Sequence, residues 1–522
     1  MMMSNIRDMR GFLASPTATT IGVTCAAALV LPLTPSAVAA TTSPAQSGAR
    51  SAPTLVHPDA LNVPGALNAS DALNAPGALN APGFPDASGI PGSTQSLPLV
   101  PLTPSTRDRA LGPVAPDQGL TRDDVHHFSM VGVIWDDPDL ELHGRVQVRT
   151  REAGTGAWSG WQDLQTHNDD GADPGAPERA SGHVRGATAP LWVGDSDGVD
   201  VRVRAEGERR TDDGDRGTRA VAAAGSLPSG LRLELVDPGQ EPAPRAALPP
   251  ALHGIPAGAP RVRAVTAESA ESAASLAAAA ADADLAPLGA TVIPALTRSA
   301  TLREVRTLGL GESTVVQRAN PYIGPRPRII TRRGWGANES LREKGFVYTK
   351  KVKAAFVHHT ASGNGYSCSQ APSVIRGIYR YHVRSMGWRD IGYNFLVDKC
   401  GNIYEGRAGG VAKPVLGAHT LGFNTNSMGI AVLGSFGSSK PPAAVLKAIA
   451  RLTAWKLGLY GANPRGKTYL TSGGGNLYRK GKNVRLNVIS GHRDGFATEC
   501  PGVQLYRKLG TARSTAAHYQ GR

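Results

Sequence analysis

The stretch Ser490-Gly-His-Arg-Asp-Gly-Phe-Ala-Thr-Glu-Cys-Pro-Gly502 places a histidine, His492, ahead of a cysteine, Cys500. Imidazole nitrogen and thiolate sulfur are both good zinc donors. The spacing between them is too loose for one face of a helix, and it does not match the close cysteine pairs of a zinc finger. The stretch therefore predicts a loop that curls around one metal ion.

A catalytic zinc site needs a third protein ligand and an open fourth position. The best source is Val357-His358-His359-Thr360-Ala361, which ends the apolar run 354–357 and is followed by Ser362-Gly-Asn-Gly365. This pattern predicts a buried strand that ends in a turn. Because neighbouring side chains on a strand face opposite ways, only one of His358 and His359 can point at the ion, and spacing alone leaves both open.

Six sequence blocks occur in the order found in one known family. They are His358-His359-Thr360-Ala361, Gly387-Trp-Arg-Asp-Ile-Gly-Tyr-Asn-Phe-Leu-Val397, Ile403-Tyr-Glu-Gly-Arg407, Gly417-Ala-His419, Gly491-His-Arg-Asp494 and Thr498-Glu-Cys-Pro-Gly502. Over roughly residues 325–512 they resemble the peptidoglycan recognition proteins of the type 2 N-acetylmuramoyl-L-alanine amidase family, in its secreted actinobacterial form. The first histidine of the His-His-Thr block is the ligand in that family, so the resemblance implies zinc held by His358, His492 and Cys500.

The resemblance also implies roles beside the metal. Tyr393 lies where catalytic members carry a tyrosine, whose hydroxyl can hydrogen-bond the water or the oxyanion, although its apolar strand alone favours a core tyrosine. Thr498 stands at a position that is Thr in several animal members and Lys in phage amidases, and it would support the oxyanion or only brace the ligand loop. Groove positions that would contact substrate, each of which could equally be structural, are His382, Trp388, Arg407, His419 and Asn424.

No carboxylate in these motifs is clearly a general base. Glu405 and Asp390 are candidates, but a buried structural acid fits each of them better. Of the remaining cysteines, Cys368 precedes the helical pattern 370–386 and Cys400 follows the predicted strand 393–398. Because the protein has the features of an exported one, we expect a Cys368–Cys400 disulfide, with two buried thiols as the alternative.

Residues 1–40 resemble a secretory leader, with Arg7 and Arg10 ahead of the apolar run 20–33 and small residues at 37–40 for cleavage. The run is too short and too flanked by proline for a spanning helix, and a retained anchor is the alternative. No later stretch is long and apolar enough to span a membrane. The sequence thus predicts a secreted, extracellular or wall-associated protein, which we expect to be monomeric.

Charge is unevenly distributed along the chain. Residues 321–522 hold 31 Lys and Arg against 7 Asp and Glu, a net of +24, whereas the whole chain carries +14, so residues 1–320 carry −10. A strongly basic domain favours polyanions. No basic motif interleaved with aromatic residues supports nucleic acid, so peptidoglycan and anionic wall polymer are the expected partners, with a solvated basic surface as the alternative.

The composition predicts six segments. A spacer at 41–121, with a hexad repeat at 60–83, and an Ala/Pro-rich linker at 239–324 are expected to be disordered, although 264–281 has helical composition. Between them, residues 122–238 show short alternating runs typical of an all-β sandwich or barrel. This segment is similar to domains that precede the amidase domain in secreted actinobacterial proteins. Its Trp135, Trp158, Trp161 and Trp192 would form a sugar-stacking face or, more often, core.

The amidase domain at 325–512 is expected to be α/β, with a central mixed sheet, helices at 370–386, 443–459 and around 503–510, and a tail at 513–522. The predicted function is hydrolysis of the amide bond between N-acetylmuramic acid and L-alanine of the stem peptide. A non-catalytic peptidoglycan sensor is the first alternative, but such members usually lack the cysteine ligand. A second alternative is a zinc peptidase that cuts within the stem peptide, but the chain lacks the H-E-x-x-H helix expected of one. A third is an adhesive wall protein, whose function would lie in the β domain.

Overall fold

The computed structural model describes residues 91–102, 117–166, 170–206, 227–240 and 267–522, all within one compact unit, Pro76–Arg522. The predicted leader at 1–40 and the hexad repeat at 60–83 lie outside the described residues. Among the residues that are described, no helix combines the length and the apolar character that a membrane span requires.

The first part of the described chain is all β, as the alternating runs predict. Its nine-stranded sheet has the order β1-β9-β4-β8-β3-β2, with β5 joined to β8 and β6, and β7 joined to β4, and every pair is antiparallel. Alternate residues of β5 are buried, and the core gathers the inward side chains of β4, β5, β8 and β9. The strands are β1 Ser93–Pro98, β2 Val100–Pro101, β3 Asp117–Arg122, β4 Phe128–Trp135, β5 Gly144–Glu152, β6 Gln162–Leu164, β7 Gly186–Ala187, β8 Leu191–Ala205 and β9 Arg232–Asp237.

Three of these strands correct the sequence prediction. The expected spacer reaches residue 121, but β1, β2 and most of β3 lie inside it. Their sequences, STQSLP, VP and DQGLTR, are short and mostly polar, so they lack the alternation that signals a strand. They are strands because neighbouring strands supply backbone hydrogen bonds: β1 pairs with β9, β3 with β8, and β2 with β3. The described β unit therefore begins near Ser93 instead of residue 122.

The second part of the chain is built on a seven-stranded mixed sheet, which confirms the predicted α/β domain. Its order is β10-β11-β14-β13-β15-β12-β18, with parallel pairs β12/β15, β12/β18, β13/β15 and β11/β14 and antiparallel pairs β10/β11 and β13/β14. The strands are β10 Val292–Ile293, β11 Ile329–Ile330, β12 Ala354–His359, β13 Phe395–Val397, β14 Ile403–Glu405, β15 Ser427–Val432 and β18 Ile489–Gly491.

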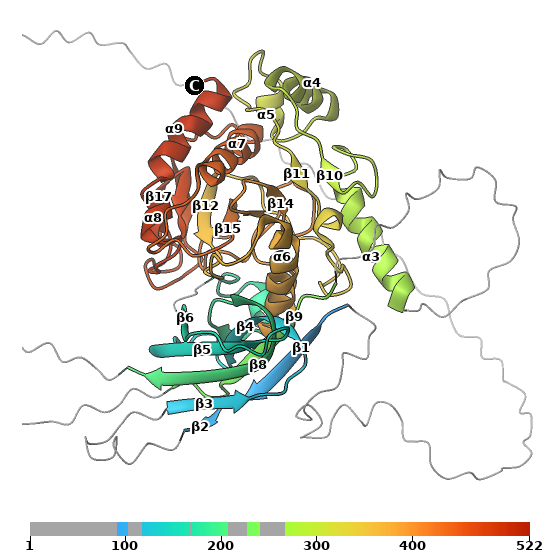
Figure 1. The fold of residues 1–522 in the computed structure, drawn as a ribbon. Coiled ribbons are helices and arrows are strands. Elements are labelled where there is room, and N and C mark those ends of the chain that lie inside the picture. The colour runs from blue at the N-terminus through green and yellow to red at the C-terminus, as the bar shows by residue number, and fades with distance from the viewer. Residues whose placement is uncertain (1–90, 103–116, 167–169, 207–226, 241–266) are drawn as a thin grey trace, which may run out of the picture. The chain divides into compact units, whose positions relative to one another are not determined.

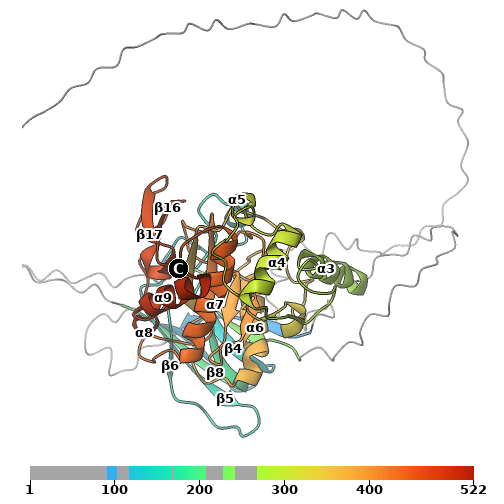
Figure 2. The ribbon, with the colours of Figure 1, turned by 90° about the horizontal axis from the view of Figure 1, so that it is seen from above.

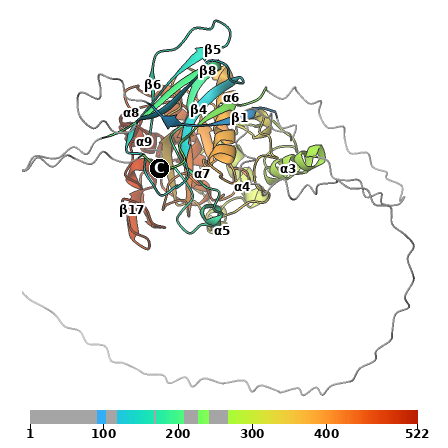
Figure 3. The same cartoon turned by 90° about the horizontal axis from the view of Figure 1, so that it is seen from below.

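Helices cover both faces of this sheet (Figures 1 and 2). Val357, Val397 and Ile430 face α7 (Ala443–Leu459) and α9 (Leu509–Gln520). Leu396 and Ala431, one residue out of phase, face α6 (Ala371–Arg380) on the other side. The alternation of side chains on each strand thus creates two cores. A separate hairpin of β16 (Lys467–Thr471) and β17 (Asn483–Asn487) projects from the domain, with both strands labelled in Figure 2 and β17 in Figure 3.

Helix bounds also correct two boundaries. The expected linker 239–324 contains α3 (Ala267–Ala281), β10, α4 (Arg298–Leu308) and α5 (Ser313–Val316), and its Ile293, Val305 and Val315 belong to the core under α7. Their apolar runs are short and stand in a segment rich in Ala and Pro, a composition that favoured the linker prediction. The expected tail 513–522 instead lies mostly in α9, where Ala516 and Gln520 are fully buried. The final helix is split, since α8 covers only Val503–Tyr506.

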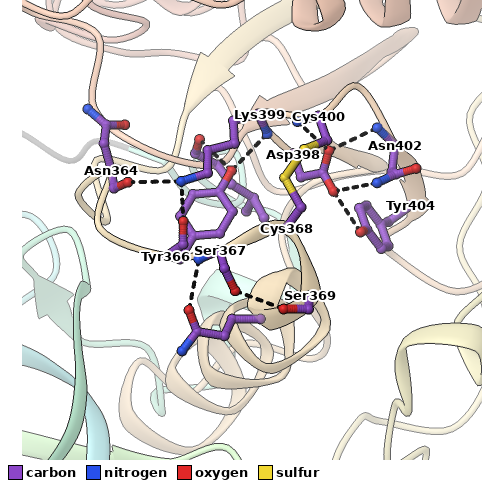
Figure 4. Close-up of a disulfide and its surroundings, with 12 residues drawn as sticks. Asn364, Tyr366, Ser367, Cys368, Ser369, Asp398, Lys399, Cys400, Asn402 and Tyr404 are labelled. Atoms are coloured by element: carbon purple, nitrogen blue, oxygen red, sulfur yellow. Dashed lines mark hydrogen bonds between the residues drawn. A yellow bond between two sulfur atoms is a disulfide. The ribbon is translucent and has the colours of Figure 1, made fainter.

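The predicted disulfide is present. Cys368 and Cys400 are bonded, with their Cα atoms 6.3 Å apart (Figure 4). The bond joins the turn Cys368–Gln370 that begins the α6 region to the turn after β13. Asp398 fixes that second turn, because its carboxylate accepts hydrogen bonds from the Cys400 amide at 2.9 Å and the Tyr404 hydroxyl at 2.9 Å. The bridge therefore ties α6 to the central sheet.

Candidate metal centre

The topology of the sheet brings the three expected ligands together. Strands β12 and β18 are adjacent and parallel, so their carboxyl ends meet at one edge. His358 stands near the end of β12, His492 directly follows β18, and Cys500 closes the loop beyond. Donor atoms of these three side chains all lie within 4.8 Å of one another, and all three residues are buried. His358 Nδ1 is 3.7 Å from Cys500 Sγ.

The two neighbouring histidines do different things. His358 is the one that turns toward His492 and Cys500, as the family resemblance implies. His359 lies on the opposite side of β12, where its Nδ1 accepts a hydrogen bond from the Phe436 amide at 3.2 Å. The backbone N–H of His359 still reaches the site, because it donates to Cys500 Sγ at 3.4 Å. That contact stabilises negative charge on the sulfur.

The chemistry of the donor set fits a zinc ion. Burial lowers the pKa of His358 and of His492 to about 3, so both rings are neutral and can donate electron pairs. Thr420 Oγ1 lies 3.3 Å from His358 Nε2 and 3.0 Å from His419 Nδ1. This chain of contacts leaves His358 Nδ1 facing the site. Among the described groups, neither ring nitrogen of buried His492 has a hydrogen-bond partner, which fits a nitrogen meant for a metal.

Tyr393 lies at the same site. Its ring centroid is 5.6 Å from that of His358, and its side chain is fully enclosed. Burial, and then the negative charge of Asp170, raise the pKa of the Tyr393 phenol, so it stays a proton donor. The hydroxyl donates to Asp170 Oδ2 at 2.5 Å. Thr498 is placed differently: its Oγ1 accepts from the Cys500 amide at 3.2 Å, which braces the ligand loop.

The predicted groove residues fall into two groups. His382, Trp388 and His419 are buried and packed: the rings of His382 and Trp388 are 4.4 Å apart, and His419 stands behind His358 with ring centroids 5.3 Å apart. These three support the walls of the site. Arg407 and Asn424 instead turn toward residues 170–178 of the β unit.

Glu405 and Asp390 take part in a buried ionic network. Arg332 donates to Asp390 Oδ1 from Nη1 at 3.1 Å and to Glu339 Oε1 from Nε at 2.6 Å. The Arg332 amide donates to Glu405 Oε2 at 3.0 Å. The structural interpretation of both acids is therefore the better supported one.

The carboxylate that does reach the metal centre is Asp170, which sequence reasoning missed. Its Oδ1 lies 3.0 Å from His358 Nδ1 and 3.4 Å from His492 Nδ1. Burial raises the pKa of Asp170 to about 6, against the lowering effect of His492 and of the Tyr393 hydrogen bond. Asp170 belongs to a loop after β6, with no motif around it, so no local signal could have found it. Thr420 was also missed, although it directly follows the Gly417-Ala-His419 block.

Comparison with known proteins agrees with this division of the chain. Residues 85–226 match the family model described as "Rv3811 N-terminal galactose-binding domain-like", and residues 348–503 match "N-acetylmuramoyl-L-alanine amidase".

Curated relatives match about a third of the chain. Peptidoglycan-recognition protein SC2 of Drosophila melanogaster is 33% identical over 185 residues, which is 35% of this chain and 85% of that protein. Human peptidoglycan recognition protein 3 is 36% identical over 149 residues, 28% of this chain and 41% of that protein. The solved structure of Drosophila PGRP-LB is 26% identical and covers 35% of this chain and 92% of that one, at a TM-score of 0.28. By its amidase domain and these relatives, the chain belongs to the family of peptidoglycan recognition proteins and type 2 N-acetylmuramoyl-L-alanine amidases.

Proposed function

We propose that this chain is a secreted, zinc-dependent peptidoglycan hydrolase that cleaves the amide bond between N-acetylmuramic acid and L-alanine of the stem peptide. The observation that carries the proposal is the buried group of His358, His492 and Cys500. The hydroxyl of Tyr393 lies beside this group and donates a hydrogen bond to Asp170, whose other carboxylate oxygen faces both histidines. Three protein ligands, not four, are typical of a catalytic zinc site. A sensor would need the groove but not the cysteine.

Zinc, when bound by these three residues, would acidify a water molecule and polarise the scissile carbonyl. The protein's own groups supply the rest. Thr420 holds the His358 ring in place, and the His359 amide stabilises the Cys500 thiolate. Tyr393 keeps its proton at neutral pH, and in this structure its hydroxyl donates a hydrogen bond to the carboxylate of Asp170. The same hydroxyl would donate to the oxyanion that develops as the carbonyl is attacked.

Substrate binding is proposed for Arg407 and Asn424, the two groove residues that turn toward residues 170–178. The Arg407 guanidinium can hold a stem-peptide carboxylate in a two-pronged contact, because it holds a carboxylate in that way here. Asn424 would hydrogen-bond the peptide backbone. The relatives' names state peptidoglycan recognition, and the net charge of +24 over residues 321–522 would attract the same anionic wall polymer. We extend both properties, and export through residues 1–40, to this chain as part of the proposal.

The test is the identity of the products. Purified disaccharide-peptide would be incubated with the full chain, with the chain treated with a chelator, and with the treated chain after zinc is restored. We expect free stem peptide that begins with L-alanine in the first and third reactions only. Binding of the disaccharide-peptide without any release of peptide, by protein that contains stoichiometric zinc, would instead support the sensor.

A further inference from the structure

One acidic segment of the β unit, residues 170–178, lies in the part of the site that substrate would need. At its start, the Asp170 side chain is 1% exposed. One carboxylate oxygen faces the Nδ1 atoms of His358 and His492, at 3.0 and 3.4 Å, and has no hydrogen-bond partner among the described groups. The other oxygen accepts the Tyr393 hydroxyl at 2.5 Å. A buried carboxylate with one oxygen left free of hydrogen bonds is costly unless something else pairs with it.

The spacing of these atoms matches a set of metal ligands. Zinc–ligand distances of about 2.0–2.3 Å in a tetrahedron place the donor atoms about 3.3–3.6 Å from one another. The atoms here are separated by 3.0 Å (Asp170 Oδ1 to His358 Nδ1), 3.4 Å (Asp170 Oδ1 to His492 Nδ1) and 3.7 Å (His358 Nδ1 to Cys500 Sγ). Asp170 Oδ1 therefore lies close to the ligand nitrogens of both histidines, beside the buried group of His358, His492 and Cys500.

The same segment continues along the predicted substrate residues. The Asn424 amide donates to the Gly171 carbonyl at 2.8 Å and to Asp173 Oδ1 at 2.7 Å, and the Gly422 amide donates to Asp173 Oδ1 at 2.8 Å. These contacts take up the groups that a bound peptide backbone would use.

Further along, Glu178 pairs with Arg407. Arg407 donates from Nη1 to Glu178 Oε2 and from Nη2 to Glu178 Oε1, each at 2.9 Å, and both side chains are at most 6% exposed. Glu178 also accepts the Arg389 amide at 3.2 Å. An acidic segment thus presents one carboxylate to the metal centre and another to the guanidinium proposed for the stem peptide.

The β unit is packed so that this segment stays in place. Met130, Ile134 and Val236 of its strands share a buried cluster with Ile375 and Ile378 of α6. Backbone and side-chain hydrogen bonds surround this contact, including Tyr381 OH to the Thr188 carbonyl at 3.1 Å and Ser385 Oγ to Glu234 Oε2 at 2.7 Å. Burial of these apolar side chains stabilises the contact between the β unit and α6, so the segment is held in place by more than its own polar bonds.

We propose that residues 170–178 are an intramolecular occupant of the substrate groove, with Asp170 as a fourth metal ligand supplied by the β unit, so that this structure is the closed, resting form of the enzyme. The proposal rests on the proposed function. Site and occupant are encoded in one chain, and the carboxylates of Asp170 and Glu178 take the places of the reacting carbonyl and of a stem-peptide carboxylate. Peptidoglycan must displace the segment before it can be cleaved.

The test uses full-length protein with Asp170→Ala, the isosteric Asp170→Asn and Glu178→Gln. Asp163→Ala is the matched control, because Asp163 is an aspartate of the same β unit that accepts hydrogen bonds from Arg145 and Gln147, away from the metal centre. Zinc affinity is measured by competition with a chromophoric chelator, and the metal's surroundings by the visible spectrum after cobalt replaces zinc. Circular dichroism checks that each variant is folded. Cleavage of disaccharide-peptide is measured on the same samples.

Asp170→Ala should bind zinc at least about tenfold more weakly than the native chain, because it loses a ligand and even the loss of a residue that supports a ligand has an effect of that size. Its cobalt spectrum should also change. Asp170→Asn should show the same change, whereas Asp163→Ala should match the native chain. Glu178→Gln should leave zinc affinity alone. Both Asp170→Ala and Glu178→Gln should cleave faster than the native chain, because the groove is vacated.

Unchanged zinc affinity and an unchanged cobalt spectrum in both Asp170 variants would overturn the ligand assignment. Weaker zinc binding together with cleavage slower than native would overturn the occupant, and would make Asp170 part of the catalytic machinery. If the Asp170 variants bound zinc more weakly but neither they nor the native chain cleaved at saturating zinc, the assignment of Asp170 as a ligand would stand and the amidase proposal would fail. The two proposals therefore fail in different ways.

Discussion

The hydroxyl of Tyr393 serves two opposed purposes in this account, and Tyr393→Phe separates them. The ring should keep its place, since it is buried against His358 and His382 with centroid distances of 5.6 Å to each. Loss of a donor to the oxyanion should slow turnover by about two to three orders of magnitude. Loss of the 2.5 Å hydrogen bond to Asp170 should weaken the closed form by about 1.5–3 kcal/mol, the usual value for a bond to a charged group.

In the native chain the two effects change the cleavage rate in opposite directions, since loss of the oxyanion donor slows cleavage and a weaker closed form speeds it. Without the Asp170 carboxylate, only the loss of the oxyanion donor remains. A change of 1.5–3 kcal/mol corresponds to about a tenfold to hundredfold gain in open protein, so it masks part of the catalytic loss. With Asp170→Ala as the background, no such gain remains. The fold-loss caused by Tyr393→Phe should therefore be at least about tenfold larger in the Asp170→Ala background than in the native one.

The assay is the cleavage rate of disaccharide-peptide by the four proteins of this cycle, at equal and saturating zinc. Tyr379→Phe is the control, because it also removes a buried tyrosine hydroxyl, one that donates to the Asn338 carbonyl at 3.0 Å. Equal losses in both backgrounds would refute the coupling. If Tyr393→Phe cleaved at the parent rate in the Asp170→Ala background, the oxyanion role given to Tyr393 would be wrong.

Other expectations concern the metal, the disulfide and one buried lysine. Cys500→Ser should lose zinc and cleavage together, as elemental analysis after dialysis will show, and one zinc per chain in that variant would contradict the ligand set. Replacing both Cys368 and Cys400 by serine should lower the unfolding free energy by about 4 kcal/mol, from the loop-entropy estimate for a separation of 32 residues, and urea unfolding with no such loss would count against it. Burial lowers the pKa of Lys456 to about 7, although Asp282 nearby acts to raise it. Above that pH the unfolded chain binds more protons than the folded one, so stability should rise from pH 7 toward the ordinary lysine value, by at most about 1.4 kcal/mol per pH unit. Lys456→Met should lose this rise, and parallel pH profiles for the two proteins would show that the lysine is not its source.

Much of the amidase domain could be predicted from local sequence. The apolar run before His358 is a strand, and α7 spans Ala443–Leu459 as its apolar positions predict. The alternation of side chains along the strand could not decide between His358 and His359, because both faces of this strand are apolar and buried. Only the family resemblance distinguished the two histidines. The segment boundaries failed where short elements such as β1 and α5 depend on partners elsewhere in the chain.

The acidic segment could not have been predicted at all. Asp170 and Tyr393 are separated by 223 positions, and their contact depends on how the β unit packs on α6. Nothing in the sequence around Asp170, or around Glu178 in the short helix α2 (Pro177–Ala180), distinguishes them from ordinary surface acids until that packing is known. The groove residue Arg407 was identified from its motif, but its partner could come only from the structure.

Cleavage in water enriched with heavy oxygen tests the central claim most directly. The native chain and the Asp170→Ala protein, each loaded with zinc, would be given disaccharide-peptide, and the products separated for mass analysis. We expect one heavy oxygen to enter the lactyl carboxylate of the muramic acid fragment, the released peptide to begin with unlabelled L-alanine, and chelation to prevent both. Heavy oxygen in a carboxylate of the peptide, or no cleavage by either zinc-loaded protein, would contradict the proposal that this chain is an N-acetylmuramoyl-L-alanine amidase.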